Sequence, residues 1–182
     1  MVNLSTFPRN VVRALLLDVD FYNEAEQDTS LELQAFFVVV VANLLGGIGS
    51  AVATDATDTD PAVAIALGAL AGAVTGVVGW LVWSAIANWV GTRLFGGSAD
   101  FGEMRRVIGF SFAPLAIGVI PWLGFVGAAW ALVAAMIAVR EGLDFSTQRA
   151  VATVVLGWGS WLVISVAAQV MLGLDLRVSL PF

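Results

Sequence analysis

The segment that decides the fold runs from Arg105 to Arg140 and reads RRVIGFSFAPLAIGVIPWLGFVGAAWALVAAMIAVR. Its apolar interior, Val107 to Val139, is longer than the roughly 20 residues that one membrane-spanning helix needs, and it is short for two. A single crossing would place Arg140 on the opposite side of the membrane from Arg105. A hairpin that turns at Ile120-Pro121-Trp122 would leave both arginines on the same side.

The other arginines favour the hairpin. Arginine is the only basic residue type in the chain, and its eight copies lie almost entirely between the apolar stretches. Cytoplasmic loops of membrane proteins carry an excess of basic residues, so the topology that gathers them on one side is preferred. With the hairpin, only Arg177 lies outside. The arginines that then face the cytoplasm are Arg9, Arg13, Arg93, Arg105, Arg106, Arg140 and Arg149.

Three further apolar stretches complete a prediction of five spans. Gln34 to Ala53, Ala62 to Ala87 and Val151 to Leu172 are each long enough to cross the bilayer. We therefore predict an all-α, polytopic membrane protein with five transmembrane helices, of which the third and fourth form the hairpin. Residues 1–33 are predicted to be a cytoplasmic N-terminal segment, residues 34–172 the membrane domain and residues 173–182 a short external tail.

Two local patterns refine this organisation. Phe7 to Leu17 is predicted to form an amphipathic helix in the headgroup layer, because its large apolar residues would otherwise lie in water. The third helix is predicted to start near Phe101, where Asp100 and Glu103 have the spacing of a capping box. Pro121 makes the hairpin turn, and Pro114 is expected to kink or loosen the helix before it.

Composition excludes several classes of function. The chain is 59% hydrophobic and 12% charged, whereas charged residues make up roughly a quarter of a soluble domain. It has no cysteine and no histidine, so thiol chemistry and the commonest metal ligand are missing. We expect no enzyme activity, no metal and no cofactor. Nucleic acid is excluded as a partner because positive charge is not clustered.

The charge balance suggests a source. Fourteen acidic residues stand against eight arginines, and lysine is absent. An acidic surface of this kind is typical of proteins that work at high salt, where screening removes most of the self-repulsion. A halophilic archaeon is the favoured source. The alternative is an ordinary small, acidic membrane protein that uses arginine in place of lysine.

Small residues mark a packing face in the second span. Gly68, Gly72 and Gly76 form a row that lets another helix approach closely, either from this chain, which is the default, or from another copy. Asn43, near the middle of the first span, is expected to hydrogen-bond to a neighbouring helix, because an unsatisfied amide is costly in hydrocarbon.

Four tryptophans lie deep in the predicted spans. They are Trp83, Trp130, Trp158 and Trp161. Packing against glycine-rich faces is the preferred explanation, and a crevice for a lipid or an apolar ligand is the alternative. No ionisable residue lies deep in any span, which disfavours a transporter coupled to an ion gradient.

Three motifs resemble a known family. They are GGSADF at Gly96–Phe101, RRVIGFSFAP at Arg105–Pro114 and REGLDFSTQRA at Arg140–Ala150. With the hairpin between them, they are similar to the prokaryotic, and by composition haloarchaeal, branch of the YIP domain family, the Ypt/Rab-interacting integral membrane proteins. The sequence departs from that branch at Val19, where a proline is often found.

The resemblance implies a five-span protein with a cytoplasmic N-terminus. It also implies structural roles for Arg105, Arg106, Arg140 and Glu141 at helix ends, and for Pro114 in shaping the third helix. Eukaryotic members are linked to vesicle formation and prenylated small GTPases, whereas a prokaryotic chain has no obvious partner of that kind.

Two functions follow as hypotheses. The first is a non-enzymatic scaffold of the plasma membrane, which associates with itself or with other membrane proteins and organises the bilayer locally. The second is a passive permease or channel for a small uncharged or apolar solute, which the glycine-rich second span and the deep tryptophans support. A membrane enzyme is disfavoured, because the carboxylates lie on loops.

Overall fold

The structure is a computed structural model that describes residues 4–54 and 60–171, and every regular element in these ranges is a helix. Within these ranges, three segments are long and apolar enough to cross a membrane: Thr29–Ala53, which includes α3 (Glu32–Ala53), α4 (Pro61–Leu94) and α6 (Gly124–Gly142). The predicted all-helical class is confirmed. The tail predicted for residues 173–182 lies outside the described residues.

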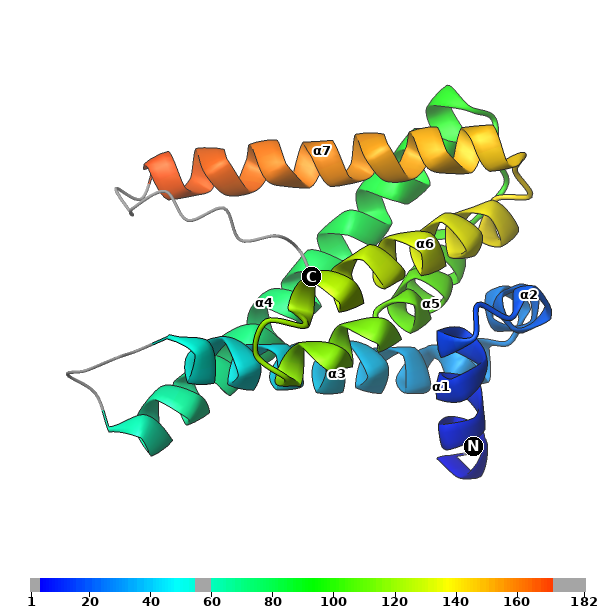
Figure 1. Cartoon of the computed structure of the whole chain (residues 1–182). Coiled ribbons are helices and arrows are strands. Elements are labelled where there is room, and N and C mark those ends of the chain that lie inside the picture. Colours follow the sequence, from blue (N-terminus) through cyan, green and yellow to red (C-terminus); the bar gives the residue numbers. More distant parts are fainter. Residues whose placement is uncertain (1–3, 55–59, 172–182) are drawn as a thin grey trace.

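Helices α5 (Phe101–Ser111) and α7 (Thr147–Met171) complete the bundle. In Figure 1, α3 to α7 run alternately between two ends of the molecule. We name them the arginine end, where α3, α5 and α7 begin, and the hairpin end, where the chain turns before α6. The helices and helix ends at the arginine end contain Arg9, Arg13, Arg93, Arg105, Arg106, Arg140 and Arg149.

The third apolar stretch contains two kinds of helix. It begins at the predicted capping box, in which Asp100 Oδ1 accepts from Glu103 N at 2.8 Å and Glu103 Oε2 accepts from Asp100 N at 2.6 Å. After α5 ends, a 3-10 helix, η3 (Ala113–Val119), continues to the hairpin end. Pro114 accounts for this change, because it cannot donate to a carbonyl one turn back.

The change of helix type preserves the reach of this stretch. At about 1.5 Å per residue in α5 and about 2.0 Å in η3, the two together extend roughly 30 Å, which is the thickness of the hydrocarbon layer. The chain then turns through Ile120, Pro121 and Trp122, where the hairpin was predicted.

Helix α4 is much longer than its neighbours. Its 34 residues correspond to about 51 Å, and the predicted span ended at Ala87 whereas the helix ends at Leu94. A helix that exceeds the hydrocarbon thickness can fit by tilting. Figure 1 shows α4 crossing α3 obliquely, with the two helices close toward the hairpin end and apart toward the arginine end. Helix α7 packs on α4 and α6.

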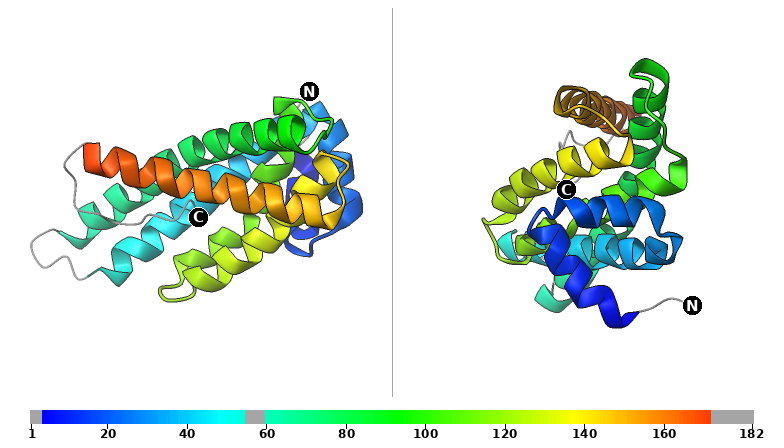
Figure 2. Two further views of the ribbon diagram at one scale, coloured as in Figure 1. Left: turned by 90° about the horizontal axis from the view of Figure 1, so that it is seen from above. Right: turned by 90° about the vertical axis from the view of Figure 1, so that its right-hand side faces the viewer.

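The N-terminal segment folds into two short helices that lie across the arginine end, as the views in Figure 2 also show. Helix α1 (Phe7–Leu15) follows a 3-10 turn, η1 (Leu4–Thr6). Helix α2 (Val19–Gln27) is capped by Asp18, whose Oδ1 accepts from Phe21 N at 3.2 Å. A second 3-10 turn, η2 (Thr29–Leu31), leads into α3.

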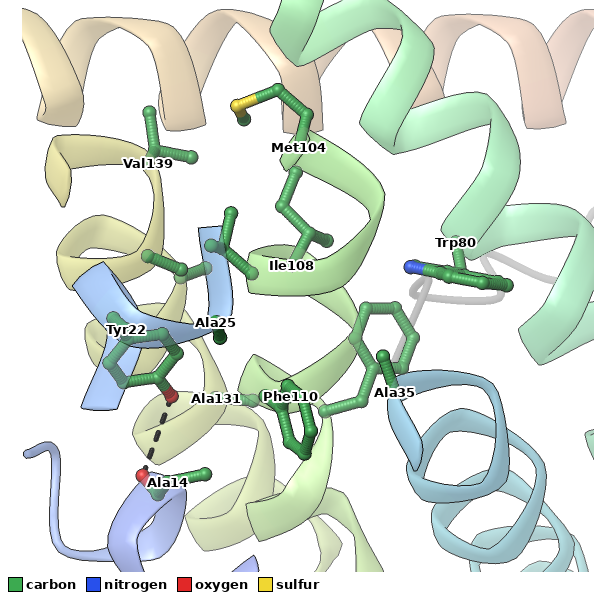
Figure 3. Packing of buried hydrophobic residues seen from close by; sticks show 14 of the residues in the cluster. Ala14, Tyr22, Ala25, Ala35, Trp80, Met104, Ile108, Phe110, Ala131 and Val139 are labelled. Atoms are coloured by element: carbon green, nitrogen blue, oxygen red, sulfur yellow. Dashed lines mark hydrogen bonds between the residues drawn. The ribbon is translucent and has the colours of Figure 1, made fainter. Parts of the chain in front are cut away.

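Both N-terminal helices share the hydrophobic core of the bundle. Phe21, Tyr22 and Ala25 of α2 are fully buried, and the Phe21 ring packs edge-on against Phe110 with centroids 4.8 Å apart. In Figure 3, the Tyr22 hydroxyl points at α1 and donates to Ala14 O at 3.4 Å. The N-terminal segment is therefore a packed layer of the structure.

The helix predicted over Phe7 to Leu17 is α1, and it is shorter than expected. Its buried face consists of Asn10 and Ala14, and the Asn10 amide donates to Gln34 Oε1 of α3 at 2.9 Å. Leu16, just after the helix, is 73% exposed and Val12 is also exposed. These apolar side chains lie outside the buried core, and the interfacial position of α1 stays a prediction.

Candidate functional site at the arginine end

Arg106 joins the N-terminal layer to the bundle. Its side chain, only 6% exposed, donates from Nε to Ala25 O at 3.0 Å and from Nη2 to Glu26 O. These are among the last carbonyls of α2, which have no partner within that helix. A guanidinium at a helix C-terminus also interacts favourably with the helix dipole. Arg106 therefore acts as a buried cap for α2.

Arg105 lies beside it with different partners. Its Nη2 contacts Glu32 Oε1 at 2.6 Å, while Arg106 Nη1 lies 3.8 Å from Glu32 Oε2. The Arg105 guanidinium also lies over the rings of Phe101 and Trp80, at 5.2 Å and 6.0 Å from their centroids. Trp80 Nε1 donates to Arg105 O at 2.8 Å, so the tryptophan is fixed against the start of α5.

A third arginine holds α1 and α2 together. Arg13 Nε donates to Asp18 Oδ2 at 2.7 Å, and Arg13 Nη1 lies 2.5 Å from Glu24 Oε2. Hydrogen bonding to Arg13 lowers the pKa of Asp18 below its ordinary value. Both charge pairs are partly exposed, so each contributes about 1 kcal/mol or less to stability. Their main effect is to fix the angle between the two helices.

Carboxylates from separate elements surround Glu26. Burial, together with the negative charges of Asp144, Glu103 and Glu141, raises the pKa of Glu26, while Arg106 opposes the rise. Among the described residues, no group of three or more acidic side chains is arranged to hold a metal ion. Burial and the neighbouring negative charges instead destabilise the ionised form of Glu26 relative to its protonated form.

The destabilised charge of Glu26 predicts that Glu26→Gln changes the stability of the folded protein in a pH-dependent way. Because the folded-state pKa lies above the ordinary value of 4.5, the stabilising contribution of Glu26 is present below that pH and is lost as the pH rises through the folded-state pKa. Glu26→Gln should therefore raise the melting temperature near neutral pH, and this gain should shrink in acid. Melting curves in detergent would measure both effects.

The control is Asp20→Asn, which removes the same charge from an exposed position on the same helix. It should not raise the melting temperature, because Asp20 lies in the first turn of α2, where a negative charge is favourable. A gain of equal size for both variants at neutral pH would mean that overall charge, and not the environment of Glu26, determines the effect.

The predicted glycine row packs within this chain. A Cβ added at Gly72 would overlap the carbonyl oxygen of Asn43 and lie 3.0 Å from the Cα of Gly47. One at Gly68 would lie 2.7 Å from Gly47 O, and one at Gly76 would overlap the Asn43 side chain. The row therefore receives α3 in close backbone contact.

Asn43 has a different hydrogen bond from the one expected. Its Nδ2 donates to Val39 O, one turn back in the same helix, at 2.8 Å. The side chain thereby satisfies a donor locally while packing against Gly76 of α4. The Asn43 amide therefore contributes packing volume at the interface with α4, and its hydrogen bond lies within α3.

The four deep tryptophans do not form one crevice in the described part of the chain. Trp83 is buried against Phe112, with ring centroids 6.0 Å apart, and a Cβ at Gly157 of α7 would lie 2.9 Å from its Nε1. Trp130 is exposed and Trp158 is half-buried. The side chain of Trp161 lies outside the described part. Trp83 thus packs against a glycine, as preferred from the sequence.

The remaining landmark residues lie at helix ends. Arg140 pairs with the adjacent Glu141, Nη2 to Oε1 at 2.6 Å, in the last turn of α6. Pro114 lies at the start of η3, and Pro121 lies in the turn before α6. Arg105, Arg106, Arg140 and Glu141 are therefore all at the arginine end, while the two prolines shape the hairpin.

Among the described residues, cavities open between the helices at both ends of the bundle. One, of about 490 Å³, lies at the arginine end beside Arg105 and Trp80. The other, of about 730 Å³, lies at the hairpin end between α3, α4, η3 and α6, and Trp122 and Phe125 are among its lining residues. Neither lining includes Trp83, Trp130 or Trp158, where a crevice was the alternative explanation from the sequence, because depth within a span does not reveal where neighbouring helices diverge.

The apolar helices long enough to cross a bilayer and the clustering of arginine at one end define a helical membrane protein. A family model, the Yip1 domain, matches residues 14–172 of the chain. The protein therefore belongs to the Yip1 domain family, which confirms the family to which its motifs are similar. No curated protein and no solved structure matches it.

Proposed function

We propose that this protein is a non-enzymatic membrane scaffold that binds other membrane proteins, or further copies of itself, through a fixed layer at its arginine end. The observation that carries the proposal is that the buried Arg106 donates hydrogen bonds to the last carbonyls of α2. It makes the N-terminal helices a rigid part of the bundle, whereas a free acidic tail would present no defined surface. A preorganised surface binds with a smaller loss of entropy.

The outer face of α2 supports this function. Asp20, Asn23, Glu24 and Gln27 are exposed along it, opposite the buried Phe21. A surface of this charge attracts and orients a basic segment of a partner. The acidic, lysine-free composition further supports a halophilic archaeal source, in whose cytoplasm such contacts would be strongly screened and would act at short range.

The proposed topology has five spans, with α5 and η3 together forming the third and the arginine end in the cytoplasm. The chain has no cysteine, so single cysteines can report on it directly. Ser98→Cys and Ser146→Cys, exposed at the arginine end, should be protected from an impermeant thiol reagent in intact cells. Thr54→Cys and Trp122→Cys, exposed at the hairpin end, should react. Labelling of Ser146→Cys from outside would contradict the hairpin and the five-span count.

The scaffold proposal predicts contacts without transport. A photocrosslinking amino acid at the exposed Asn23 should give a discrete crosslinked species in native membranes, whereas one at the buried Ala25 should not. The purified protein in liposomes should add no solute flux above the lipid background. Absence of any crosslink from the exposed face of α2, with the protein folded and inserted, would contradict the scaffold.

The hairpin-end cavity keeps the permease as a second candidate. Its small side chains and its polar Asn43, Ser50 and Thr75 would suit an uncharged solute. On α3 and α4, however, its lining begins at Ala42 and ends at Thr75, so it occupies only the hairpin half of the bundle. Saturable uptake that Ser50→Trp abolishes, by filling this cavity in a folded protein, would favour the permease over the scaffold.

A further inference from the structure

The cavity at the arginine end is a product of how α4 crosses α3. The two helices are in backbone contact at Gly47 and Gly68 and diverge from there toward the arginine end, as Figure 1 shows. The space that opens between them measures about 490 Å³ and is closed on one side by Arg105 of α5. This volume is within the range of small-molecule sites, roughly 300–1,000 Å³.

The walls of this cavity are divided by polarity. Its polar side is formed by Thr29, Ser30, Glu32 and Arg105, at the point where the chain enters α3. Thr29 and Ser30 are exposed, so their hydroxyls are accessible. The polar side therefore lies at the boundary between the N-terminal layer and the membrane bundle.

The opposite side is apolar and continues into the bundle. It consists of Leu33 and Phe36 on α3 and Val77, Trp80 and Leu81 on α4. Leu33 and Phe36 are exposed, although both belong to a helix that is long and apolar enough to cross a membrane. In a bilayer, this side of the cavity faces the lipid chains.

The polar side has one arginine whose charge is accessible, Arg105. Glu32 pairs with Arg105 at 2.6 Å and lies 3.8 Å from Arg106, and the Glu26 carboxylate also interacts with Arg106. Arg106 is committed to the carbonyls of α2, whereas the Arg105 side chain is 31% exposed and pairs through Nη2 with Glu32. The exposed part of the Arg105 guanidinium can therefore donate to an anion, and phosphate oxygens accept from such a group in the bidentate geometry that suits it.

We propose that this cavity holds one phospholipid of the surrounding membrane, with its phosphate on Arg105 and one acyl chain along the apolar wall. A soluble phosphate would use only the polar side. A lipid without phosphate would use only the apolar side. The combination of the two sides favours a phospholipid, and basic pockets between membrane helices are known to bind such headgroups. The site is independent of whether the protein acts as a scaffold or as a permease.

Native mass spectrometry of the detergent-solubilised protein tests the site. Titration with phosphatidylglycerol should give a saturable adduct of one lipid per chain. Arg105→Gln should weaken that adduct about tenfold or more, because a hydrogen bond to a charged group is lost. Arg93→Gln removes the same charge from an exposed position on α4 and should leave the adduct unchanged. Equal loss in both variants would mean that net charge alone holds the lipid, and the proposal would fail.

A second pair of variants tests the apolar wall and does not disturb Arg105. Val77→Trp should fill the cavity and abolish the adduct, whereas Val78→Trp, at the exposed neighbouring position outside the lining, should retain it. Melting curves would show that all four variants are folded. If Arg105→Gln does not fold, this pair still decides the matter, since an adduct that survives Val77→Trp overturns the proposal.

Two competitors distinguish the source of the phosphate. Inorganic phosphate in excess should not displace the lipid, and diacylglycerol with the same acyl chains should not form a saturable adduct. Displacement by inorganic phosphate would mean a site for a soluble anion. An equally tight diacylglycerol adduct would mean that the groove recognises chains only. Either result would contradict a phospholipid site built on Arg105.

Discussion

Gly47→Ala is expected to force α3 and α4 apart and to destabilise the protein by about 1–3 kcal/mol. The added Cβ would lie 2.8 Å from the backbone carbon of Gly68 and closer still to its oxygen, and 3.3 Å from the Cα of Ala69. These are backbone atoms, so no side chain can rotate to make room. The expected result is a lower melting temperature in detergent and in lipid. Gly72→Ala, which would meet the carbonyl of Asn43, should act in the same direction.

Gly46 provides a matched control on the same helix. A Cβ there would have nothing within 4 Å, so Gly46→Ala should gain about 1 kcal/mol of helix propensity without a clash. Comparing the melting temperatures of Gly46→Ala and Gly47→Ala separates the effect of the close contact with α4 from the general effect of replacing a glycine in a helix. Equal melting temperatures for Gly46→Ala and Gly47→Ala would show that α3 and α4 do not approach each other as described.

Arg106→Met is expected to release the N-terminal layer. The substitution keeps much of the apolar volume but leaves Ala25 O and Glu26 O without the charged donor that caps α2. Hydrogen bonds to charged groups contribute about 1.5–3 kcal/mol each, so the loss should be about 3 kcal/mol or more. Hydrogen exchange is the sharpest measurement: amides of α2 should lose protection, while those of α6 should keep theirs.

Arg93→Met is the control, because it removes an exposed arginine from the same end of the bundle. It should leave the protection of α2 unchanged. Arg106→Lys keeps the charge but replaces the fork of donors by a single ammonium, so it should restore protection only in part. Full protection of α2 in Arg106→Met would contradict the role of Arg106 as a cap, and would remove the observation on which the scaffold proposal rests.

The sequence predicted the features that depend on local patterns. Apolar length predicted the long helices, the spacing of Asp100 and Glu103 predicted the start of α5, and Pro121 predicted the turn. These signals are carried by residues that are close in the chain. The glycine row likewise marked the face of α4 that receives α3, because close approach of two helices requires small residues on one of them.

Features that depend on distant residues were not predictable in the same way. Helix α2 was missed because its acidic residues conceal an apolar face of only three residues, Phe21, Tyr22 and Ala25. Asp18 at its N-cap and the spacing of these three residues were the available signals. The burial of Arg106 and the cavity beside Arg105 depend on contacts with segments far away in the chain. No local pattern in the sequence shows which of these distant residues meet.

The contact between Arg106 and α2 also bears on the order of biosynthesis. Ala25 and Arg106 are separated by 81 residues, so α1 and α2 leave the ribosome well before their partner exists. At roughly 5–20 residues per second, the interval is about 4–16 s. During this interval, the α5 residues against which α2 packs have not been synthesised. The membrane surface is the apolar environment then available to the side chains of Phe21 and Tyr22. The N-terminal helices are thus made first and dock only after Arg106 has been synthesised.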